Sequence, residues 1–449
     1  MKMSKSSLLL LFLISACITN VTSDFFVFNK NINDYHSIGF NPSYIDYNPE
    51  GKKFKVSIMS TAHFSNNSIS LDWINNELLS GKELNNDQEK VDFLSIFKDE
   101  DVSISSFAQV QLGINYKDYS FLISPQSFGN ILLPYSVIDL TFYGLDFDKN
   151  ISFDTEKSQF QAVLPITFAH SLNIDKYITK FNLPVKNVKA GISSKLLLGL
   201  AFFETNFSNS NIDSDEDFVE LSGNVNSTYS LFGSQMLVDE NDYGNSEFEL
   251  GTNYGFSGTG FAFDLGLSAD YSDHINFGVS LNNLLGQIAW SLSSTYDYNM
   301  TYSLNISSGE FEEIADYSEE QRDSLFSSII TYESNNKVMS TKKTPYPTYL
   351  LVNGSYAIKD ILFSSHILVP FDNSYYKGGE LSVAVTYEKF KKVPLHFQLN
   401  YSKENSVKWF VGLDLNFKKY ELKAGFSQSG GFINSAKGIS FGISHTIKF

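Results

Sequence analysis

The residue types that usually carry chemistry are sparse in this sequence. Its seven histidines are scattered, and no two of them lie at the spacing of paired metal ligands. Neither a G-x-S-x-G nucleophile turn nor an H-E-x-x-H zinc motif occurs. The sequence therefore predicts a protein that is not an enzyme and that holds no cofactor and no metal.

One acidic cluster is the exception that must be weighed. Asp213, Asp215, Glu216 and Asp217 offer oxygen ligands that suit Ca²⁺ or a divalent bridge to lipopolysaccharide. Asn and Ser residues surround the cluster, so a solvated surface loop over 209–218 explains the same residues. We expect the loop.

The first residues have the layout of a secretory signal peptide. Lys2 and Lys5 precede the apolar run 8–14, which is too short to span a bilayer. Cleavage after Ser23 gives a signal peptide of residues 1–23. In the alternative reading, 14–17 is a lipoprotein signal and Cys17 is the lipidated first residue of the mature chain. Either reading predicts export.

The composition indicates a large β protein. Aromatic residues make up 15% of the chain, with 40 Phe and 25 Tyr, and prolines number only 10. Cys17 is the only cysteine, so disulfides do not stabilise the exported protein. The formal net charge of −17 argues against nucleic acid as a partner.

Apolar and polar residues alternate with a period of two along the whole chain, as strands with two different environments require. No linker or composition shift divides the chain, so 51–449 is read as one domain. We expect roughly 14 to 16 strands among the candidate stretches 54–64, 107–116, 119–124, 138–147, 160–172, 189–207, 218–229, 261–271, 275–282, 288–304, 348–358, 360–369, 381–390, 395–402, 407–418, 420–428 and 437–449.

Connection lengths predict a barrel in an outer membrane. The turns within 356–362 and 417–422 are short, whereas 209–218 and 238–255 read as long polar loops. Short turns at one end and long loops at the other are typical of transmembrane barrels. Helical spacing of apolar residues adds two helices, within 71–97 and 317–333, and we expect both outside the lipid.

The last strand reads as an insertion signal. Phe441, Ile443, His445, Ile447 and Phe449 share one apolar and aromatic face, and small or polar residues occupy the other. A terminal phenylalanine on such a strand resembles the signal that the outer-membrane insertion machinery recognises. His445 is read as part of the aromatic girdle.

A soluble β-sandwich would also alternate, but its packed core would not accept Ser, Asn, Gln, Lys and Asp on the second face. We therefore expect an all-β fold, a single antiparallel transmembrane β-barrel of 14 to 16 strands with a few short loop or plug helices.

A motif in 255–290 carries a family resemblance. The segment "GFSGTGFAFDLGLSADYSDHINFGVSLNNLLGQIAW" resembles porin-like proteins of a family of unknown function. That family is related in architecture to FadL-like fatty-acid transporters and TraF-like barrels. The resemblance implies an outer-membrane β-barrel of about 14 strands. The glycines of "GFSGTGF" (255–261) are read as allowing a tight turn and strand curvature, and 282–286 is read as a short turn. The matching residues are Gly258, Gly260, Asp264, Leu265, Gly266, Gly278, Ser280, Asn283, Leu284, Leu285, Gly286 and Trp290.

The resemblance also suggests a function. In FadL-like barrels the N-terminal segment folds into the lumen, and 24–50 of this chain is aromatic and contains Asn41, Pro42 and Ser43. We therefore expect a luminal plug at 24–50 and passive uptake of a hydrophobic or amphipathic small molecule. The alternative is a non-transporting barrel that acts in secretion or surface assembly of exported proteins. The expected partners are outer-membrane lipid, lipopolysaccharide and the insertion machinery, and the expected location is the bacterial outer membrane.

Overall fold

A computed structural model gives the architecture of most of the chain. It describes residues 38–45, 54–79, 87–97, 100–143, 149–155, 157–181, 183–215, 218–231, 234–237, 247–250, 255–292, 295–307, 318, 331–339, 341–371, 378–402 and 406–449. The expected signal peptide, Cys17 and the segments 24–37 and 46–50 lie outside this part of the chain. No helix within the described ranges is both long and apolar enough to cross a membrane.

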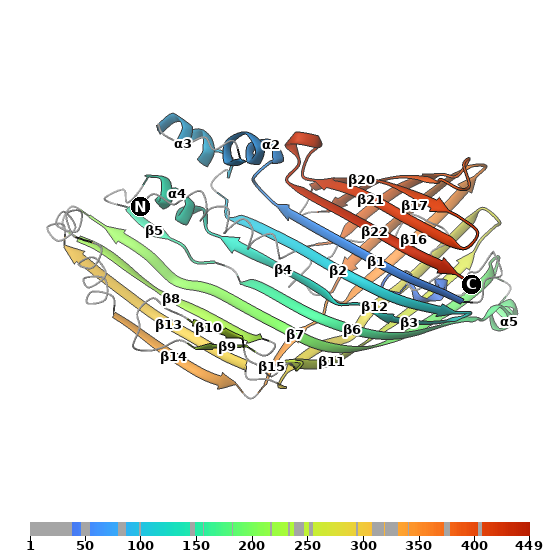
Figure 1. Ribbon diagram of the computed structural model, residues 1–449, viewed down its shortest axis with the longest axis horizontal. Coiled ribbons are helices and arrows are strands. Elements are labelled where there is room, and N and C mark those ends of the chain that lie inside the picture. The colour runs from blue at the N-terminus through green and yellow to red at the C-terminus, as the bar shows by residue number, and fades with distance from the viewer. Residues whose placement is uncertain are drawn as a thin grey trace.

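The strands form a closed antiparallel barrel of 14 strands (Figure 1), which confirms the predicted fold class. Two positions in the wall are each filled by two short strands, β3 with β4 and β15 with β16. The barrel strands are β1 (Phe54–Asn66), β2 (Val102–Tyr116), β3 (Tyr119–Ile123), β4 (Gln126–Leu133), β6 (Ser158–Asn173), β7 (Lys186–Ser214), β11 (Gly258–Asp270), β12 (Ile275–Trp290), β15 (Lys342–Pro345), β16 (Tyr349–Ile358), β17 (Ile361–Pro370), β18 (Glu380–Tyr387), β19 (Leu395–Ser402), β20 (Ser406–Asn416), β21 (Tyr420–Ser429) and β22 (Gly438–Lys448).

The last strand closes the barrel. β22 pairs with β21 on one side and with β1 on the other, where the register runs from Lys55 opposite Lys448 to Ser65 opposite Gly438. The Phe449 amide donates to the Phe54 carbonyl at 2.9 Å, and the two rings lie 5.5 Å apart. Closure leaves no free edge in the barrel wall, which a sheet surrounded by lipid requires.

The wall has its apolar side outside and its polar side inside. Leu112, Phe168, Ile192, Phe263 and Val383 are 39–52% exposed on the outer face. The inward positions are buried and often polar: Ser193, Asp264, Ser280, Gln398 and Thr446 are each at most 1% exposed. This pattern is the reverse of a soluble protein and is the one that a lipid-facing barrel shows.

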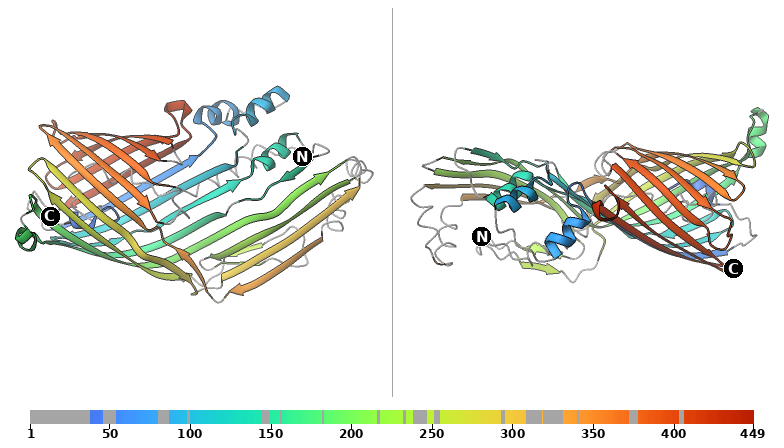
Figure 2. Two further views of the ribbon diagram at one scale, coloured as in Figure 1. Left: turned by 180° about the vertical axis from the view of Figure 1, so that it is seen from behind. Right: turned by 90° about the horizontal axis from the view of Figure 1, so that it is seen from above.

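β7 is long enough to belong to two sheets. Up to Gly199 it pairs with β11 in the barrel, and from Ala201 onward it pairs with β8 (Phe218–Leu231). β13 (Thr295–Ser307) adds to β8, and β14 (Thr331–Met339) adds to β13. β5 (Lys149–Ser152) flanks the far end of β7, and β9 (Ser234–Leu237) pairs with β10 (Glu247–Leu250). The result is a sheet that protrudes from the barrel end opposite Phe449 (Figure 2).

Short helices lie at both ends of the barrel. α2 (Leu71–Trp73), the π-helical turn η3 (Ile74–Leu79), α3 (Asp87–Leu94), α4 (Tyr135–Tyr143) and η5 (Ile433–Ser435) belong to the end of the protruding sheet, and α5 (Asp175–Ile178) with η4 (Thr179–Phe181) to the end of Phe449 (Figure 1). The predicted helices within 71–97 are therefore confirmed. The helix expected within 317–333 falls almost entirely outside the described residues, and β14 already begins at Thr331.

Three local predictions are wrong. The expected strand 138–147 is the helix α4 as far as Tyr143, because Pro134 ends the preceding strand and Asp101 accepts from the Tyr135 amide at 3.0 Å. The expected loop 209–218 is mostly the paired ends of β7 and β8. The expected strand 288–304 is divided between the end of β12 and most of β13.

Candidate functional site

The chain's own N-terminal segment crosses the lumen. Residues 38–45, here called the plug segment, contain the one-turn helix η2 (Pro42–Tyr44), and Asn41 caps that turn by accepting from the Ser43 amide at 3.0 Å. Ile38 and Ile45 pack against Leu122 and Ala169 of the wall. Phe40 packs against a separate cluster formed by Tyr349, Leu351, Leu368 and Ala384. The segment therefore bridges β3 and β6 on one side of the lumen to β16, β17 and β18 on the other.

Three glycines make room for the plug segment, and we call them the seat glycines. A Cβ on Gly191 would overlap the Pro42 and Ser43 backbone, and one on Gly266 would overlap the Asn41 side chain. A Cβ on Gly278 would lie 2.5 Å from the Tyr44 hydroxyl. Only glycine permits so close an approach of two backbones. Two members of the sequence motif, Gly266 and Gly278, therefore seat the plug, a role that the sequence did not assign to them.

Polar groups of the wall bind the backbone of the plug segment. The Asn41 amide group donates to the carbonyls of Leu267 at 3.0 Å and Val279 at 3.3 Å. In the other direction, Ser171 donates to the Ser43 carbonyl at 2.9 Å, and Ser280 donates to the Phe40 carbonyl. The plug is therefore held by hydrogen bonds at Phe40, Asn41 and Ser43 and not by packing alone.

Tyr44 is a second polar anchor. Its hydroxyl donates to Asn276 at 2.8 Å and accepts from the Asn353 amide group at 2.8 Å. Burial in the lumen raises the pKa of the Tyr44 hydroxyl, and the hydrogen bond from Asn353 offsets only part of that shift. Tyr44 is therefore a neutral donor in this contact at any ordinary pH.

The ladder of β12 is interrupted beside the plug. Asn283 and Leu285 have φ angles of 56° and 58°, and the register between β11 and β12 shifts twice around Phe263. On its other side, β12 pairs with β16 up to Asn282 and with β15 only from Gln287. The predicted short turn at 282–286 is therefore wrong, because these residues form a bulge in mid-strand. A leucine in the left-handed region is strained, and the Leu285 side chain is 83% exposed.

A buried ion pair fastens the bulge from inside. The Lys195 ammonium lies 2.8 Å from the Asp264 carboxylate, and both side chains are at most 6% exposed. Asp264 also accepts from the Asn283 amide at 2.8 Å, and Lys195 donates to the Asn283 side chain. Asn283 in turn donates to the Pro347 carbonyl at 2.6 Å. The Asp264 carboxylate therefore accepts the hydrogen bond of the Asn283 backbone amide, which the bulge leaves without a backbone partner in the sheet.

The other motif residues lie around this bulge. Gly258, Gly260 and Gly286 have no space for a Cβ, because backbone carbonyls lie against each of them. Leu265 is exposed on the outer face, and Leu284 is half-buried. Trp290 is fully buried, stacks on Phe202 at 5.4 Å between ring centroids and donates to Thr344 at 2.8 Å.

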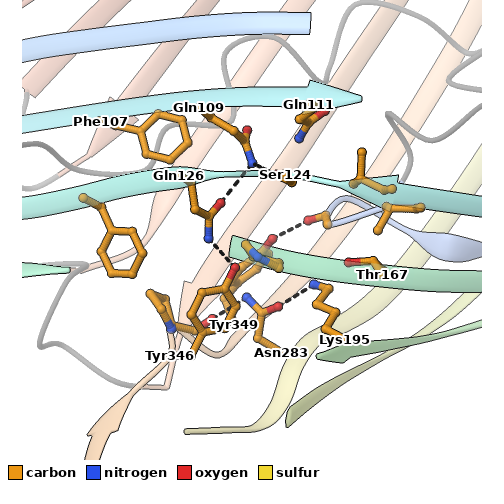
Figure 3. Close-up of a pocket in the computed structure, with 16 residues that line it drawn as sticks. Phe107, Gln109, Gln111, Ser124, Gln126, Thr167, Lys195, Asn283, Tyr346 and Tyr349 are labelled. Carbon is orange, nitrogen blue, oxygen red and sulfur yellow. Dashed lines mark hydrogen bonds between the residues drawn. The ribbon is translucent and has the colours of Figure 1, made fainter. Parts of the chain in front are cut away.

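A small cavity lies between the plug and the bulge (Figure 3). It measures about 80 Å³, and Ile38 and Gly39 of the plug form part of its lining. Its polar side is a chain of hydrogen bonds in which Gln109 donates to Ser124 at 2.7 Å and to Gln126 at 2.9 Å, and Gln126 donates to Tyr346. Its apolar side includes Phe107, Leu122 and Phe128.

Among the residues that line this cavity, sequence reasoning singled out only Asn283. Lys195 carried a usable signal, because it is the only charged residue among the alternating positions 190–200 and falls on the inward face. Gln109, Gln126 and Tyr346 carried none, because polar residues occur at inward positions throughout the barrel. Among the described residues, no three His, Cys, Asp or Glu side chains gather as a metal site, and Glu216 and Asp217 lie outside that part of the chain.

The predicted insertion-signal residues all lie on β22 or next to it. Phe441, Ile447 and Phe449 point outward and are 47–63% exposed. His445 is half-buried on the same face, and its Nδ1 lies 2.6 Å from the Tyr420 hydroxyl. This placement suits an aromatic girdle. The role of these residues as an insertion signal stays a prediction.

The fold and its luminal segment define a closed barrel with an internal plug and an apolar outer wall. The profile of a family of unknown function, DUF5723, matches residues 48–424, so this chain belongs to that family. The match confirms the resemblance drawn from 255–290 to a porin-like family of unknown function. No curated protein matches the sequence.

Solved barrels of similar architecture were also found. The toluene transporter TbuX of Ralstonia pickettii is 9% identical, with a TM-score of 0.48 over 93% of this chain and 94% of that chain. A FadL homologue of Pseudomonas aeruginosa is 9% identical, with a TM-score of 0.47 over 96% and 99%. The toluene transporter TodX of P. putida is 11% identical, with a TM-score of 0.46 over 93% and 94%. These values are low, so the functional proposal below rests on the geometry of this chain.

Proposed function

We propose that this protein is a plugged outer-membrane channel for the passive uptake of a hydrophobic or amphipathic small molecule. The observation that carries the proposal is the plug segment, which crosses the lumen on a seat of three glycines. If the lumen were filled only to stabilise the barrel, side chains of the wall could fill it, and no glycines would be needed to make room for a separate segment. The glycines at Gly191, Gly266 and Gly278 instead keep one wall bare for a separate piece of chain.

The cavity beside the plug supports the choice of solute. One side presents amides and phenol groups, and the other presents aromatic and aliphatic carbon. Sites for small molecules usually combine these two kinds of surface, at volumes of roughly 300–1,000 Å³. The 80 Å³ present here admits only a few water molecules. Passage of a larger solute therefore requires the plug segment to move.

An aromatic cluster above the cavity offers an apolar approach to it. Phe107, Phe128, Phe202, Trp290 and Tyr346 belong to one buried cluster on the luminal side of the wall. The cluster lies on the side of the protruding sheet, whereas the plug lies on the side of Phe449. A solute that enters from the end of the protruding sheet would therefore pass this apolar cluster, which shares Phe107, Phe128 and Tyr346 with the cavity, before it reaches the plug.

Removing the plug tests this function. Deletion of residues 24–50 from the exported protein should raise conductance in planar bilayers and speed the uptake of a hydrophobic probe into cells. If the unheated protein migrates faster on a gel than the boiled protein, the barrel still forms in the deletion variant. Unchanged conductance and uptake in a barrel that passes this control would contradict the proposal.

The protruding sheet favours a second candidate, a barrel that serves secretion or surface assembly of exported proteins. β7, β8, β13 and β14 extend well beyond the barrel, and within the described residues β14 pairs only with β13. An edge strand of this kind can add a strand from another chain. Co-purification of exported proteins that depends on residues 331–339, with no uptake of small molecules, would favour this candidate.

The proposed location is the outer membrane, with lipid and lipopolysaccharide around the wall and the insertion machinery acting on β22. Deleting Phe449 removes the ring that packs on Phe54 at the closing seam. We expect the amount of barrel in the outer membrane to fall about tenfold, while export across the inner membrane continues. Immunoblots of separated membranes measure this ratio, and normal insertion of the deletion variant would refute the role of Phe449.

A further inference from the structure

The outer wall carries an apolar groove on the strands β12, β16, β17, β18 and β19. Its floor is a row of paired positions on four neighbouring strands. Along this row Phe277 pairs with Gly354, Gly354 pairs with Ser365, and Ser365 pairs with Val383. The larger side chains Tyr356, Phe363, Val385 and Phe397 border the groove on the side of the short turns. The groove measures about 480 Å³ and is lined mainly by carbon. It is a depression in a surface that is otherwise covered by large apolar side chains.

The depth of the groove places it in one leaflet. Gly354 and Ser365 each lie four residues from the ends of their strands at the turn Lys359–Asp360. At about 3.3 Å per residue this is roughly 13 Å along the strand. The hydrocarbon of one leaflet is about 15 Å thick. An extended acyl chain whose headgroup lies at the level of the turns therefore reaches the floor of the groove.

The two turns below the groove are rich in lysine. Lys359 and Asp360 connect β16 to β17, and 388–394, "EKFKKVP", connects β18 to β19. Lys359, Lys389, Lys391 and Lys392 are exposed, against the two acids Asp360 and Glu388, of which Glu388 is only half-exposed. The chain as a whole has a net charge of −17, whereas these two turns together carry four lysines against two acids.

Aromatic rings complete the interface at the same level. Phe390 is 61% exposed between the lysines, and its ring meets that of Tyr387 edge-on at 6.4 Å. Tyr387 and Tyr356 point outward at the ends of their strands and are 36% and 45% exposed. Tyrosine and phenylalanine beside lysine are the residues that settle at the boundary between acyl chains and headgroups.

We propose that this groove and its two turns bind an anionic phospholipid of the leaflet at the short-turn end. An acyl chain occupies the groove over Gly354 and Ser365, and the lysines of the two turns bind the phosphate and the charged headgroup. Charge complementarity selects this occupant, because the apolar groove alone would accept any acyl chain. The inference rests on the proposed membrane location, and it adds the class of lipid and its place on the wall.

Gly354 offers a clean way to fill the groove. A Cβ at this position meets only the Asn276 carbonyl oxygen, at 3.8 Å, so a larger side chain fits without strain and points into the groove. Gly354→Leu should therefore fold, and Ser365→Leu is a second variant with the same aim. Ser194→Leu is the matched control, because Ser194 is an exposed outward position on β7, away from the groove.

The test is native mass spectrometry of the full barrel in detergent, titrated with phosphatidylglycerol or with phosphatidylethanolamine of the same acyl chains. One lysine near a lipid surface favours an anionic lipid by about fivefold, so we expect a preference of at least that size for one phosphatidylglycerol. Lys389→Gln/Lys391→Gln/Lys392→Gln should abolish the preference, whereas Lys418→Gln/Lys419→Gln on the turn from β20 to β21 should retain it. Gly354→Leu should weaken the binding of both lipids, and Ser194→Leu should not.

Equal binding of the two lipids by the wild-type barrel, or a preference that survives the triple lysine variant, would overturn the proposal. Conversion of a dimer to a monomer by Gly354→Leu would also overturn it, because the groove would then be occupied by a second copy. Conductance and uptake of these variants should stay at the wild-type level. The lipid site and the channel can therefore fail independently of each other.

Discussion

The two halves of the lumen are filled in different ways. Along β7, β11 and β12 the seat glycines leave room at the inner wall, and the plug segment lies on them. Along β19 to β22 and β1 the wall's own side chains fill the space. There Glu421 binds Lys423 and Lys448 at 2.9 Å each, and His396 lies 3.1 Å from Asp414.

On the function proposed above, this difference would separate a movable part of the lumen from a fixed part. The wall's side chains belong to the barrel strands themselves. The plug segment is tied to the wall by a few hydrogen bonds and two apolar contacts, so gating would require only these contacts to break while the barrel stays closed. We therefore place gating in the half that carries the seat glycines and structural support in the other half.

The largest effect on stability is expected at the fastening of the bulge. Asp264→Ala leaves the buried Lys195 ammonium without its carboxylate and the Asn283 amide without its acceptor. Breaking a buried pair in this way costs about 3–5 kcal/mol. Unfolding of the reconstituted barrel in urea measures the loss. Lys195→Met/Asp264→Leu should recover much of it, and an unchanged unfolding midpoint for Asp264→Ala would show that the ion pair does not hold the wall.

A smaller effect is expected in the fixed half. Glu421→Gln removes the charge that the half-buried Lys423 and the buried Lys448 share, which should cost roughly 2 kcal/mol. Conductance should not change, because the plug segment, as far as the structure describes it, packs against β3, β6 and β16 to β18 and not against these residues. The same urea unfolding and a planar bilayer measure the two quantities. An open channel in Glu421→Gln would break the division of the lumen into a movable and a fixed half.

The smallest effect concerns the junction between the barrel and the protruding sheet. Partial burial by itself would raise the pKa of Glu204, but hydrogen bonds from Lys157 at 2.9 Å and Lys342 at 3.0 Å outweigh it and hold the pKa below its ordinary value of 4.5. A carboxyl group whose pKa is lowered by folding stabilises the folded protein at pH values above its ordinary pKa of 4.5. This stabilisation is lost as the pH falls through the lowered pKa of the folded state.

Because Lys157 is exposed, we expect the Glu204 contribution to be less than about 1 kcal/mol. Melting curves of the wild type and of Glu204→Gln should differ at pH 7 and converge below pH 4. A constant difference across this range would mean that the Glu204 contacts do not tie the junction together.

The barrel was readable from the sequence because its two environments impose a strict alternation. Ile192, Phe263 and Val383 lie on the apolar outer face and Ser193 faces the lumen, so the alternation in the sequence indicates two different environments. Alternation fails where the chain leaves the membrane. In 138–147 apolar residues belong to a helix that begins after Pro134, and in 209–218 polar residues pair as strands outside the lipid.

The site was readable only in part. The motif glycines stand out in the sequence, but their purpose depends on a segment more than 140 residues away, because Gly191, Gly266 and Gly278 come together only when the barrel closes on residues 38–45. The bulge at Asn283 looked like a turn because asparagine tolerates left-handed dihedrals in both settings. A bulge and a turn are distinguished by how β12 pairs with its neighbouring strands, which the residue types do not reveal.

One pair of substitutions tests the gating role of the plug most directly. Gly191→Ala places a methyl group where the Pro42 backbone lies, whereas Gly354→Ala places one on the outer wall, where nothing is nearer than 3.8 Å. In planar bilayers we expect the Gly191→Ala barrel to open and to conduct several times more current, while Gly354→Ala matches the wild type. Equal conductance of the three barrels, each shown by gel migration to be folded, would contradict the account.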